Sequence, residues 1–547
     1  MLFDLNAVGA DEWTADICVV GAGAAGITLA RRLLDRGHAV LLLESGGGDY
    51  EPDTAALNDG ANVGHDYYPL KDSRLRFFGG TTAIWGGRCA ELDPIDLERR
   101  DWVPGSGWPM KWRELQRYYR SARPLFGLPA NAPTIGDMAQ AGLTVPAFDP
   151  EALQTPLWTF DARFNRFTLS SCTDLVRHPR CTILTHATVT EIVAHPDAGH
   201  VEALRVASTG GAMLTIRPRQ IVLAAGGIEN ARLLLASRSV MSMGLGNGHD
   251  LVGRYFMEHP HARGGRVLTT HAWSLLKLFG RRHRIAGHDV AALITPSAAL
   301  QRQRQVLNTS LTVVARQPET ASQAIGMRVY GGLKHDIAPT RAGRALWMGT
   351  KTVANWAQRH VDPLRPWLLH KAGRAELALL VRAEQAPNPD SRVMLTGKTD
   401  ALGMPRVALD WRLSAIDKHS VGILVETLGA ELRRLGLGDV RAADWLADES
   451  QPWRTDPLVS AHPIGGYHHI GTTRMADDPR RGVVDGHGRV HGIANLYIVG
   501  SSTFPTASWA NPTLTIAALA LRTADHIGSR SQSVTLPTKD PHHAAQF

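Results

Sequence analysis

The sequence predicts an α/β protein in which a dinucleotide-binding domain is interrupted by a second domain of mixed α+β structure. Three observations support this prediction. A glycine-rich turn joins two short apolar segments near the start of the chain, within residues 15–46. Alternating apolar and polar residues, from about 187 to 217, lead into an apolar run and a pair of glycines. At 547 residues the chain is also long enough for more than one domain.

The first element of this fold is a βαβ unit. An apolar strand is expected over residues 17–20, a helix runs from the glycine turn to Gly37, and a second strand covers residues 39–43. Ala24 lies in the turn, where the N-terminus of the helix faces a phosphate group. At three positions a tight turn, a close approach to pyrophosphate and close helix–strand packing exclude a side chain: Gly21, Gly23 and Gly26.

The end of the second strand carries the acidic residue of the same unit. Glu44 stands where its carboxylate can accept hydrogen bonds from both ribose hydroxyls of a dinucleotide. The unit by itself fits FAD and NAD equally well, and its place near the chain start favours FAD. A later apolar strand over residues 221–225, followed by Gly226, Gly227 and a helix, allows a second close approach of backbone to a dinucleotide. That second approach strengthens the prediction of FAD.

Composition bounds the class of protein. Hydrophobic residues make up 44% and charged residues 20% of the chain, as in ordinary globular enzymes. No apolar run approaches the roughly 20 residues of a membrane-spanning helix, so no integral membrane segment is expected. The N-terminus has no secretory signal pattern, so a cytoplasmic location is expected. The arginines behind the net charge of +8 are spread along the chain, which argues against a nucleic-acid partner.

Two further patterns have structural explanations. The four cysteines never form a CxxC pair, which argues against a disulfide scaffold, a zinc site or an iron–sulfur cluster. The stretch 341–374 alternates tryptophan and leucine with basic residues. We interpret it as a solvated amphipathic helix, with a lid or a membrane-surface helix as the alternative.

Several separate motifs carry a family resemblance. The stretch Phe77–Tyr119 contains GGTTAIWGG and GSGWPM, and the C-terminal region contains YHHIGTTRM and SWANPTLT. In order and spacing these motifs resemble the glucose/methanol/choline (GMC) oxidoreductases, in particular the sugar-oxidising branch with pyranose oxidase and the fructose dehydrogenase large subunit. The resemblance covers residues of about 12–120, 180–262 and 455–527, but not the middle of the chain.

The resemblance implies how FAD is held. The GGTTAIWGG loop of the family lies along the flavin, and further residues contact adenine, the ribityl chain and the flavin ring. The matching residues here are Gly80, Thr81, Thr82, Trp85, Gly86, Val189, Gly500, Ser501, Asn511, Pro512 and Thr513. Pyranose oxidase has a flavin-linked histidine at the position of Ile84, so the resemblance implies non-covalent FAD.

The resemblance also implies the catalytic pair. Oxidation of CH–OH needs a base for the hydroxyl proton, and a neutral histidine suits this task near neutral pH. The family places this base in an HxxG motif and a histidine or asparagine about forty residues later. His468 and Asn511 match these two positions, and His469 is interpreted as a packed neighbour. The EHPH segment, residues 258–261, matches a hinge of the family and is interpreted as structural, without metal.

The resemblance implies a split domain organisation. The expected segments are a first FAD-binding segment (12–95), an insertion or lid that contributes to the substrate domain (96–160), a second FAD-binding segment (161–264), a substrate-binding domain with a sheet that roofs the flavin (265–455), a third FAD-binding segment with the catalytic pair (456–527) and a flexible tail (528–547).

The implied activity is FAD-dependent oxidation of a secondary CH–OH group of a sugar, glycoside or related polyol, with hydride transfer to the flavin. A non-sugar alcohol and a flavin-containing lyase without net redox are the alternatives. The small-molecule substrate needs an electron acceptor, and the sequence leaves oxygen, a dye, a quinone and a cytochrome equally open.

Overall fold

The computed structural model describes residues 1–163, 165–316, 340, 342–347, 349–350, 353, 367–368, 371, 376–454 and 467–531. Most of the tryptophan-rich stretch 341–374 lies outside these residues. The expected tail lies outside them from residue 532, and residues 528–531 still belong to the last helix.

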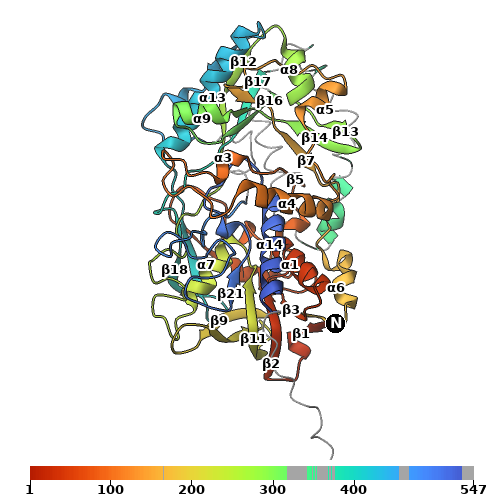
Figure 1. The fold of residues 1–547 in the computed structure, drawn as a ribbon, viewed down its shortest axis with the longest axis vertical. Coiled ribbons are helices and arrows are strands. Elements are labelled where there is room, and N and C mark those ends of the chain that lie inside the picture. The colour runs from red at the N-terminus through yellow and green to blue at the C-terminus, as the bar shows by residue number, and fades with distance from the viewer. Residues whose placement is uncertain are drawn as a thin grey trace, which may run out of the picture.

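The larger sheet has eight strands and forms the lower half of the molecule in Figure 1. Its strand order is β1–β8–β3–β2–β11–β10–β9, and β21 pairs with β11. Along this order, each pair of neighbouring strands from β1 to β11 is parallel. Strands β11, β10 and β9 form the predicted antiparallel meander. The strands are β1 (Leu2–Asp4), β2 (Glu12–Val20), β3 (Val40–Leu43), β8 (Cys181–Thr185), β9 (Thr188–Ala194), β10 (Val201–Ala207), β11 (Met213–Leu223) and β21 (Leu496–Ile498).

Helices cover this sheet and direct their N-termini to one edge of it. Helix α1 (Ala24–Asp35) follows β2, α7 (Gly227–Ala236) follows β11, and α14 (Thr513–Ser531) packs against α1. The strands β2, β3 and β11 are buried where they meet, and their side chains share one core with α1, α7 and α14. The ends of three adjacent parallel strands therefore lie beside helix N-termini, the usual position of a dinucleotide site.

A second sheet forms the upper half of the molecule (Figure 1). It has four antiparallel strands in the order β16–β17–β12–β20: β16 (Ser310–Arg316), β17 (Glu376–Arg382), β12 (His261–Leu268) and β20 (Asp439–Ala442). Helices α8 (Ala272–Phe279) and α13 (Ala415–Arg434) pack against this sheet in a separate hydrophobic core. The pair His261–Arg382, where β12 begins and β17 ends, lines the cavity described in the next section.

Residues 96–160 touch both halves. Helix α4 (Trp112–Ala122) packs on α14, where the Tyr119 hydroxyl lies 2.8 Å from Thr515 Oγ1. Strand β7 (Leu157–Phe160) instead joins the sheet β13–β14–β7–β5 with β5 (Arg88–Cys89), β13 (His283–Ile285) and β14 (His288–Ala292). The segment expected to serve the substrate domain thus also supports the helix that follows Asn511.

The remaining elements are short. One small sheet contains β4 (Gly60–Asn62), β18 (Arg392–Thr399) and β19 (Pro405–Asp410). Another pairs β6 (Leu153–Gln154) with β15 (Thr295–Pro296). The short helices are α2 (Pro52–Ala55), α3 (Pro94–Leu97), α5 (Ile135–Gln140), α6 (Thr173–Arg177) and α9 (Ala298–Arg304).

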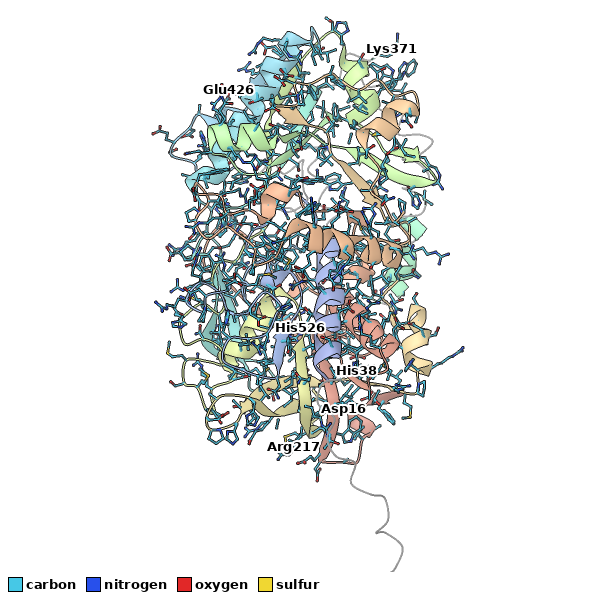
Figure 2. All side chains as sticks on the ribbon, in the orientation of Figure 1. Asp16, His38, Arg217, Lys371, Glu426 and His526 are labelled. Carbon is cyan, nitrogen blue, oxygen red and sulfur yellow. The ribbon has the colours of Figure 1, made fainter. Side chains whose placement is uncertain are left out.

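Figure 2 shows the length of the molecule: Asp16 and Arg217 lie near the lower end, and Glu426, on α13, lies near the upper end. In the described part of the chain, no helix is both long and apolar enough to span a bilayer.

Candidate active site

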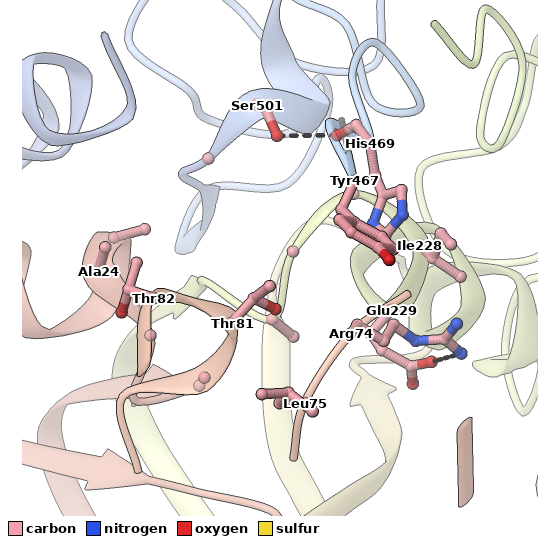
Figure 3. A pocket seen from close by; sticks show the side chains of 18 of the residues that line it. Ala24, Arg74, Leu75, Thr81, Thr82, Ile228, Glu229, Tyr467, His469 and Ser501 are labelled. Atoms are coloured by element: carbon pink, nitrogen blue, oxygen red, sulfur yellow. Dashed lines mark hydrogen bonds and ion pairs between the residues drawn. The ribbon is translucent and has the colours of Figure 1, made fainter. Parts of the chain in front are cut away.

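A cavity of about 530 Å³ lies between the larger sheet and the second sheet. Every predicted cofactor-binding residue except Gly26 lines it, as does the predicted base His468. These residues are Gly21, Gly23, Ala24, Glu44, Gly80, Thr81, Thr82, Trp85, Gly86, Val189, Gly500, Ser501, Asn511, Pro512 and Thr513. Figure 3 shows part of the cavity, with Ala24, Thr81 and Thr82 on one side and Ser501 and His469 on the other.

The glycine turn leaves room where a ligand needs it. A Cβ on Gly26 would lie 2.0 Å from the Gly21 carbonyl oxygen, and a Cβ on Gly21 would lie 2.7 Å from the Ala224 carbonyl oxygen. These two glycines are therefore required by packing within the protein. A Cβ on Gly23 would meet no protein atom within 4 Å. Gly23 caps α1 without a side-chain hydrogen bond, so the helix N-terminus opens on the cavity and suits a phosphate group.

Glu44 stands at the end of β3 with its side chain buried. Its Oε2 accepts a hydrogen bond from Ala22 N at 2.9 Å, and its Oε1 accepts one from Gly46 N at 3.1 Å. Burial raises the pKa of Glu44, and the backbone donors act in the opposite direction. Its carboxylate still borders the cavity, where ribose hydroxyls can supply further donors. This arrangement fits the adenosine end of FAD.

The GGTTAIWGG loop is anchored to the glycine turn by backbone. Gly79 N donates to Ala22 O at 2.8 Å, and Gly79 has a φ of +100° that favours glycine. Thr82 Oγ1 donates to Gly79 O at 2.6 Å, so this hydroxyl also holds the loop. Ile84 is buried and lines the cavity, as its neighbour Trp85 does.

His468 lies opposite this loop, at a strained turn. Tyr467 has a φ of +58°, which is uncommon for a residue other than glycine. Gly471, the glycine of the HxxG motif, has a φ of +87°, and a Cβ there would lie 2.3 Å from Tyr255 O. The motif glycine is thus needed for packing of the turn against residue 255. His468 Nε2 lies 3.2 Å from Asn511 Nδ2, at the cavity wall.

The ring of His468 is held in its neutral form. Burial lowers the pKa of His468 well below its usual range, and the charges of neighbouring side chains lower it further. The largest of these effects come from His259 and His469, followed by Arg88 and Arg382. A neutral imidazole is the form that can accept a proton.

His469 lies in different surroundings from His468. Its ring is buried and packs near the rings of Tyr67 and Phe256, with centroids 6.2 and 5.9 Å away. Burial lowers the pKa of His469 to about 3. Among the described residues His469 Nε2 has no hydrogen-bond partner. Its backbone oxygen accepts a hydrogen bond from Ser501 Oγ at 2.7 Å.

The structure brings together residues that sequence reasoning placed elsewhere. Glu258, His259 and His261 were interpreted as parts of a hinge, but His259 and His261 line the cavity and His259 contacts His468. Arg88 and Arg382 line it as well. Arg88 directly follows the GGTTAIWGG loop in the sequence. This proximity could have predicted its position at the cavity. The position of Arg382 depends on β12–β17 pairing, which no local motif indicates.

Glu258, His259 and His468 also offer a possible set of metal ligands, within 4.8 Å of one another. The two imidazole Nδ1 atoms are 2.7 Å apart, so one ring can donate a hydrogen bond to the other. Glu258 Oε1 accepts from Tyr67 Oη and His468 N, and Glu258 Oε2 accepts from His259 N. Tyr67, Glu258, His259 and His468 are thus joined by a continuous series of hydrogen bonds.

Comparisons with known proteins agree with an FAD-dependent oxidoreductase. A family model for GMC oxidoreductases matches residues 387–520, and one for FAD dependent oxidoreductases matches residues 16–244. The chain is 26% identical to paromamine 6′-oxidase from Streptomyces fradiae and 28% identical to 6‴-hydroxyparomomycin C oxidase from Streptomyces lividus. Both alignments cover 94% of this chain and 91% of the relative.

Solved structures agree on the fold. The crystal structure of pyridoxine 4-oxidase from Mesorbium loti has a TM-score of 0.53 and 18% identity, covering 94% of this chain and 99% of that one. The family models and the relatives together show an FAD-dependent oxidoreductase that acts on CH–OH groups. The chain belongs to the GMC oxidoreductase family, as the sequence motifs predict.

Proposed function

We propose that the protein oxidises a secondary CH–OH group of a sugar, glycoside or related polyol, with His468 as the base and Asn511 as the residue that holds the alcohol oxygen. One observation carries the proposal: His468 Nε2 and Asn511 Nδ2 are 3.2 Å apart at the wall of the cofactor cavity. A neutral imidazole beside an amide donor meets both needs of a reacting alcohol. One group takes the proton, and the other donates to the oxygen.

The steps of this proposal assign each proton to a named atom. FAD, when bound, accepts the hydride that leaves the alcohol carbon. The hydroxyl proton passes to His468 Nε2, and Asn511 Nδ2 turns from Nε2 to donate to the alcohol oxygen. Helix α14 begins at Thr513, beside the cavity, so its positive end favours negative charge there. Base and amide thus act on the oxygen while the carbon loses hydride.

The charge of the cavity wall supports a neutral or anionic substrate. Arg88 and Arg382 both line the cavity, and their charges lower the pKa of His261 as well as that of His468. A polycation such as an aminoglycoside would meet this positive field, which costs binding free energy. The substrate names of the two relatives support a substrate with a sugar ring. The two arginines support a sugar that does not carry several ammonium groups.

A second candidate is oxidation of a primary alcohol at carbon 6 of a hexose. The name of the first relative places its oxidation at position 6′, and the substrate named for the second carries a hydroxyl at position 6‴. In a hexopyranose, carbon 6 is the exocyclic carbon. Ring and exocyclic alcohols need the same base and the same amide. The product distinguishes them, because a ring position gives a ketone and carbon 6 gives an aldehyde.

The test is an anaerobic screen that follows loss of the oxidised flavin absorbance. The panel contains neutral pyranoses, glycosides, uronic acids, aminoglycosides, short alcohols and choline. We expect neutral sugars or glycosides to bleach the flavin faster than aminoglycosides and choline do. Equal or faster bleaching by a non-sugar alcohol would contradict the proposed substrate class, and product formation without bleaching would indicate a lyase.

We also propose that FAD is held without a covalent bond. Ile84 stands next to Trp85 at the flavin loop, and its alkyl side chain cannot form a bond to the ring. Acid precipitation of the yellow protein should therefore leave all of the FAD in the supernatant. Flavin that stays with the pellet would contradict this part of the proposal.

A further inference from the structure

His259 lies directly behind His468, on the side away from Asn511. The two histidines are 209 residues apart in the chain. They meet because Met257 and Ile470 form an antiparallel bridge, with hydrogen bonds of 2.9 and 3.1 Å in the two directions. The rings are edge to face, at an interplanar angle of 83°, and their Nδ1 atoms are 2.7 Å apart. The contact is therefore a direct hydrogen bond between two imidazoles.

The backbone decides which nitrogen carries each proton. His259 Nε2 is 2.7 Å from the carbonyl oxygen of Ser508, which can only accept, so Nε2 carries a hydrogen. Burial lowers the pKa of His259 to about 4, so the ring is neutral and its Nδ1 is bare. His468 Nδ1 must then donate to His259 Nδ1. Consequently His468 Nε2 carries no hydrogen, and its lone pair accepts from Asn511 Nδ2.

The carbonyl of Ser508, the first acceptor in this series of hydrogen bonds, is itself held in place. Ser508 has a φ of +60°, an uncommon conformation for a residue with a side chain. Its amide nitrogen donates to Glu384 Oε1 at 3.2 Å, and its Oγ donates to Asp96 Oδ2 at 2.6 Å. Both acceptors are buried. The direction of the carbonyl, and with it the tautomer of His259, is thus set by groups outside the cavity.

From this geometry we infer that His259 is a positioning residue for the reaction: it fixes the tautomer of His468 with a bare Nε2 and shares the proton that His468 takes up. The inference rests on the proposed function, because it assigns His259 a role toward the proposed base. When a proton arrives at His468 Nε2, the hydrogen on His468 Nδ1 can move to His259 Nδ1. His468 is then neutral again, and His259 carries the positive charge with Nε2 still donating to Ser508.

Glu258 places a compensating carboxyl beside both rings. It is completely buried, and its oxygens accept from the backbone nitrogens of His468 and His259 at 2.7 and 2.9 Å. In its ionised form it would stabilise a positive charge on either imidazole. Burial raises the pKa of Glu258 to about 7.

Two amide substitutions separate positioning from structural support. In His259→Asn the amide oxygen replaces Nδ1 and still accepts from His468 Nδ1, but the bond to Ser508 is lost. In His259→Gln the amide nitrogen replaces Nε2 and still donates to Ser508, but nothing accepts from His468. We expect the limiting rate of flavin reduction to fall about tenfold in His259→Asn and about 10²- to 10³-fold in His259→Gln, since a wrong tautomer removes the base.

The measurement is stopped-flow reduction of the holoenzyme, with equal FAD content in all variants. The opposite order, with Asn more damaging than Gln, would mean that His259 only supports Ser508 and would overturn the inference. Rates within twofold of wild type in both variants would also overturn it. If no alcohol reduces the wild-type flavin, the proposed function fails first, and a second measurement still decides the inference.

That second measurement reads the tautomers without turnover. Ring ¹⁵N resonances of histidine-labelled holoenzyme, assigned by their loss in His259 and His468 variants, distinguish bare from protonated nitrogens. We expect protonated Nε2 and bare Nδ1 in His259, and the reverse in His468. A protonated Nε2 in His468 of the wild-type protein would overturn the inference.

Discussion

The cofactor side of the cavity and the proposed catalytic side, which carries His468, are built in different ways. On the cofactor side, Gly21, Gly23 and Glu44 belong to one βαβ unit, and their positions follow from backbone hydrogen bonds between neighbouring segments. On the catalytic side, His259, His468 and Ser508 come from three distant segments joined by buried polar groups. Binding of FAD is thus encoded locally, whereas the geometry of the base depends on the whole fold. Variants on the two sides should fail in different ways.

The largest contrast is expected within the glycine turn itself. Gly26→Ala places a Cβ 2.0 Å from the Gly21 carbonyl oxygen, so the βαβ unit cannot close. We expect this variant to lose FAD and most of its folded yield. Gly23→Ala meets no protein atom within 4 Å and has an allowed φ of −84°, so the apoprotein should keep its melting temperature and lose only FAD affinity. Thermal unfolding of both apoproteins tests this contrast, and equal losses of apoprotein stability would contradict it.

The next largest effect is expected on the catalytic side, at the buried pair Arg100–Glu384. Two hydrogen bonds of 2.7 and 3.0 Å join the side chains, which are 1% and 0% exposed. Glu384→Gln leaves the guanidinium without its counter-charge, which typically costs about 3–5 kcal/mol of unfolding free energy. Glutamine keeps only one oxygen, so either Ser508 N or Asn308 N loses its acceptor. Flavin reduction should slow as well where the lost acceptor is that of Ser508.

The half-exposed pair Arg302–Glu98 is the matched control for this substitution. Glu98→Gln should cost about 0–1 kcal/mol, because solvent screens both charges. Urea unfolding of the two variants gives the comparison. Similar losses in both would mean that the catalytic side does not depend on its buried charges.

A smaller loss is expected for Glu44→Ala on the cofactor side. A charge-assisted hydrogen bond to ribose contributes about 1.5–3 kcal/mol, so the FAD dissociation constant should rise by about one to two orders of magnitude. Titration of apoprotein with FAD measures this shift. FAD affinity equal to that of the wild type would place the ribose elsewhere.

The last contrast concerns pH and His469. The pKa of His469 is lowered to about 3 in the folded protein, against about 6.5 when unfolded. The unfolded state therefore binds the extra proton first, and stability that is complete above pH 6.5 falls on acidification. In His469→Gln this fall should be shallower by about 1.4 kcal/mol per pH unit between about pH 6 and 4.

Urea unfolding at several pH values measures this slope. His249→Gln, at an exposed position, is the control and should keep the wild-type slope. A slope in His469→Gln as steep as that of the wild type would contradict the burial of a neutral ring.

The same difference between the two sides explains what the sequence predicted. The strand ending at Val20 and the helix after Gly23 were both predicted, because glycine and apolar spacing act over a few residues. The proposal that His468 and Asn511 form the catalytic pair rests on a family resemblance. His259 was assigned to a hinge, since its contact with His468 depends on the Met257–Ile470 bridge between distant segments. No local sequence pattern predicts such a bridge.

The central claim is that His468, and not its neighbour, takes the hydroxyl proton. The most direct test is the limiting rate of anaerobic flavin reduction by the best substrate in His468→Ala and His469→Ala, at equal FAD content. We expect a fall of about 10²- to 10⁴-fold in His468→Ala, with partial recovery at high pH where hydroxide replaces the base, and less than about tenfold in His469→Ala. Normal reduction in His468→Ala together with an inactive His469→Ala would contradict the account and assign the proton to His469.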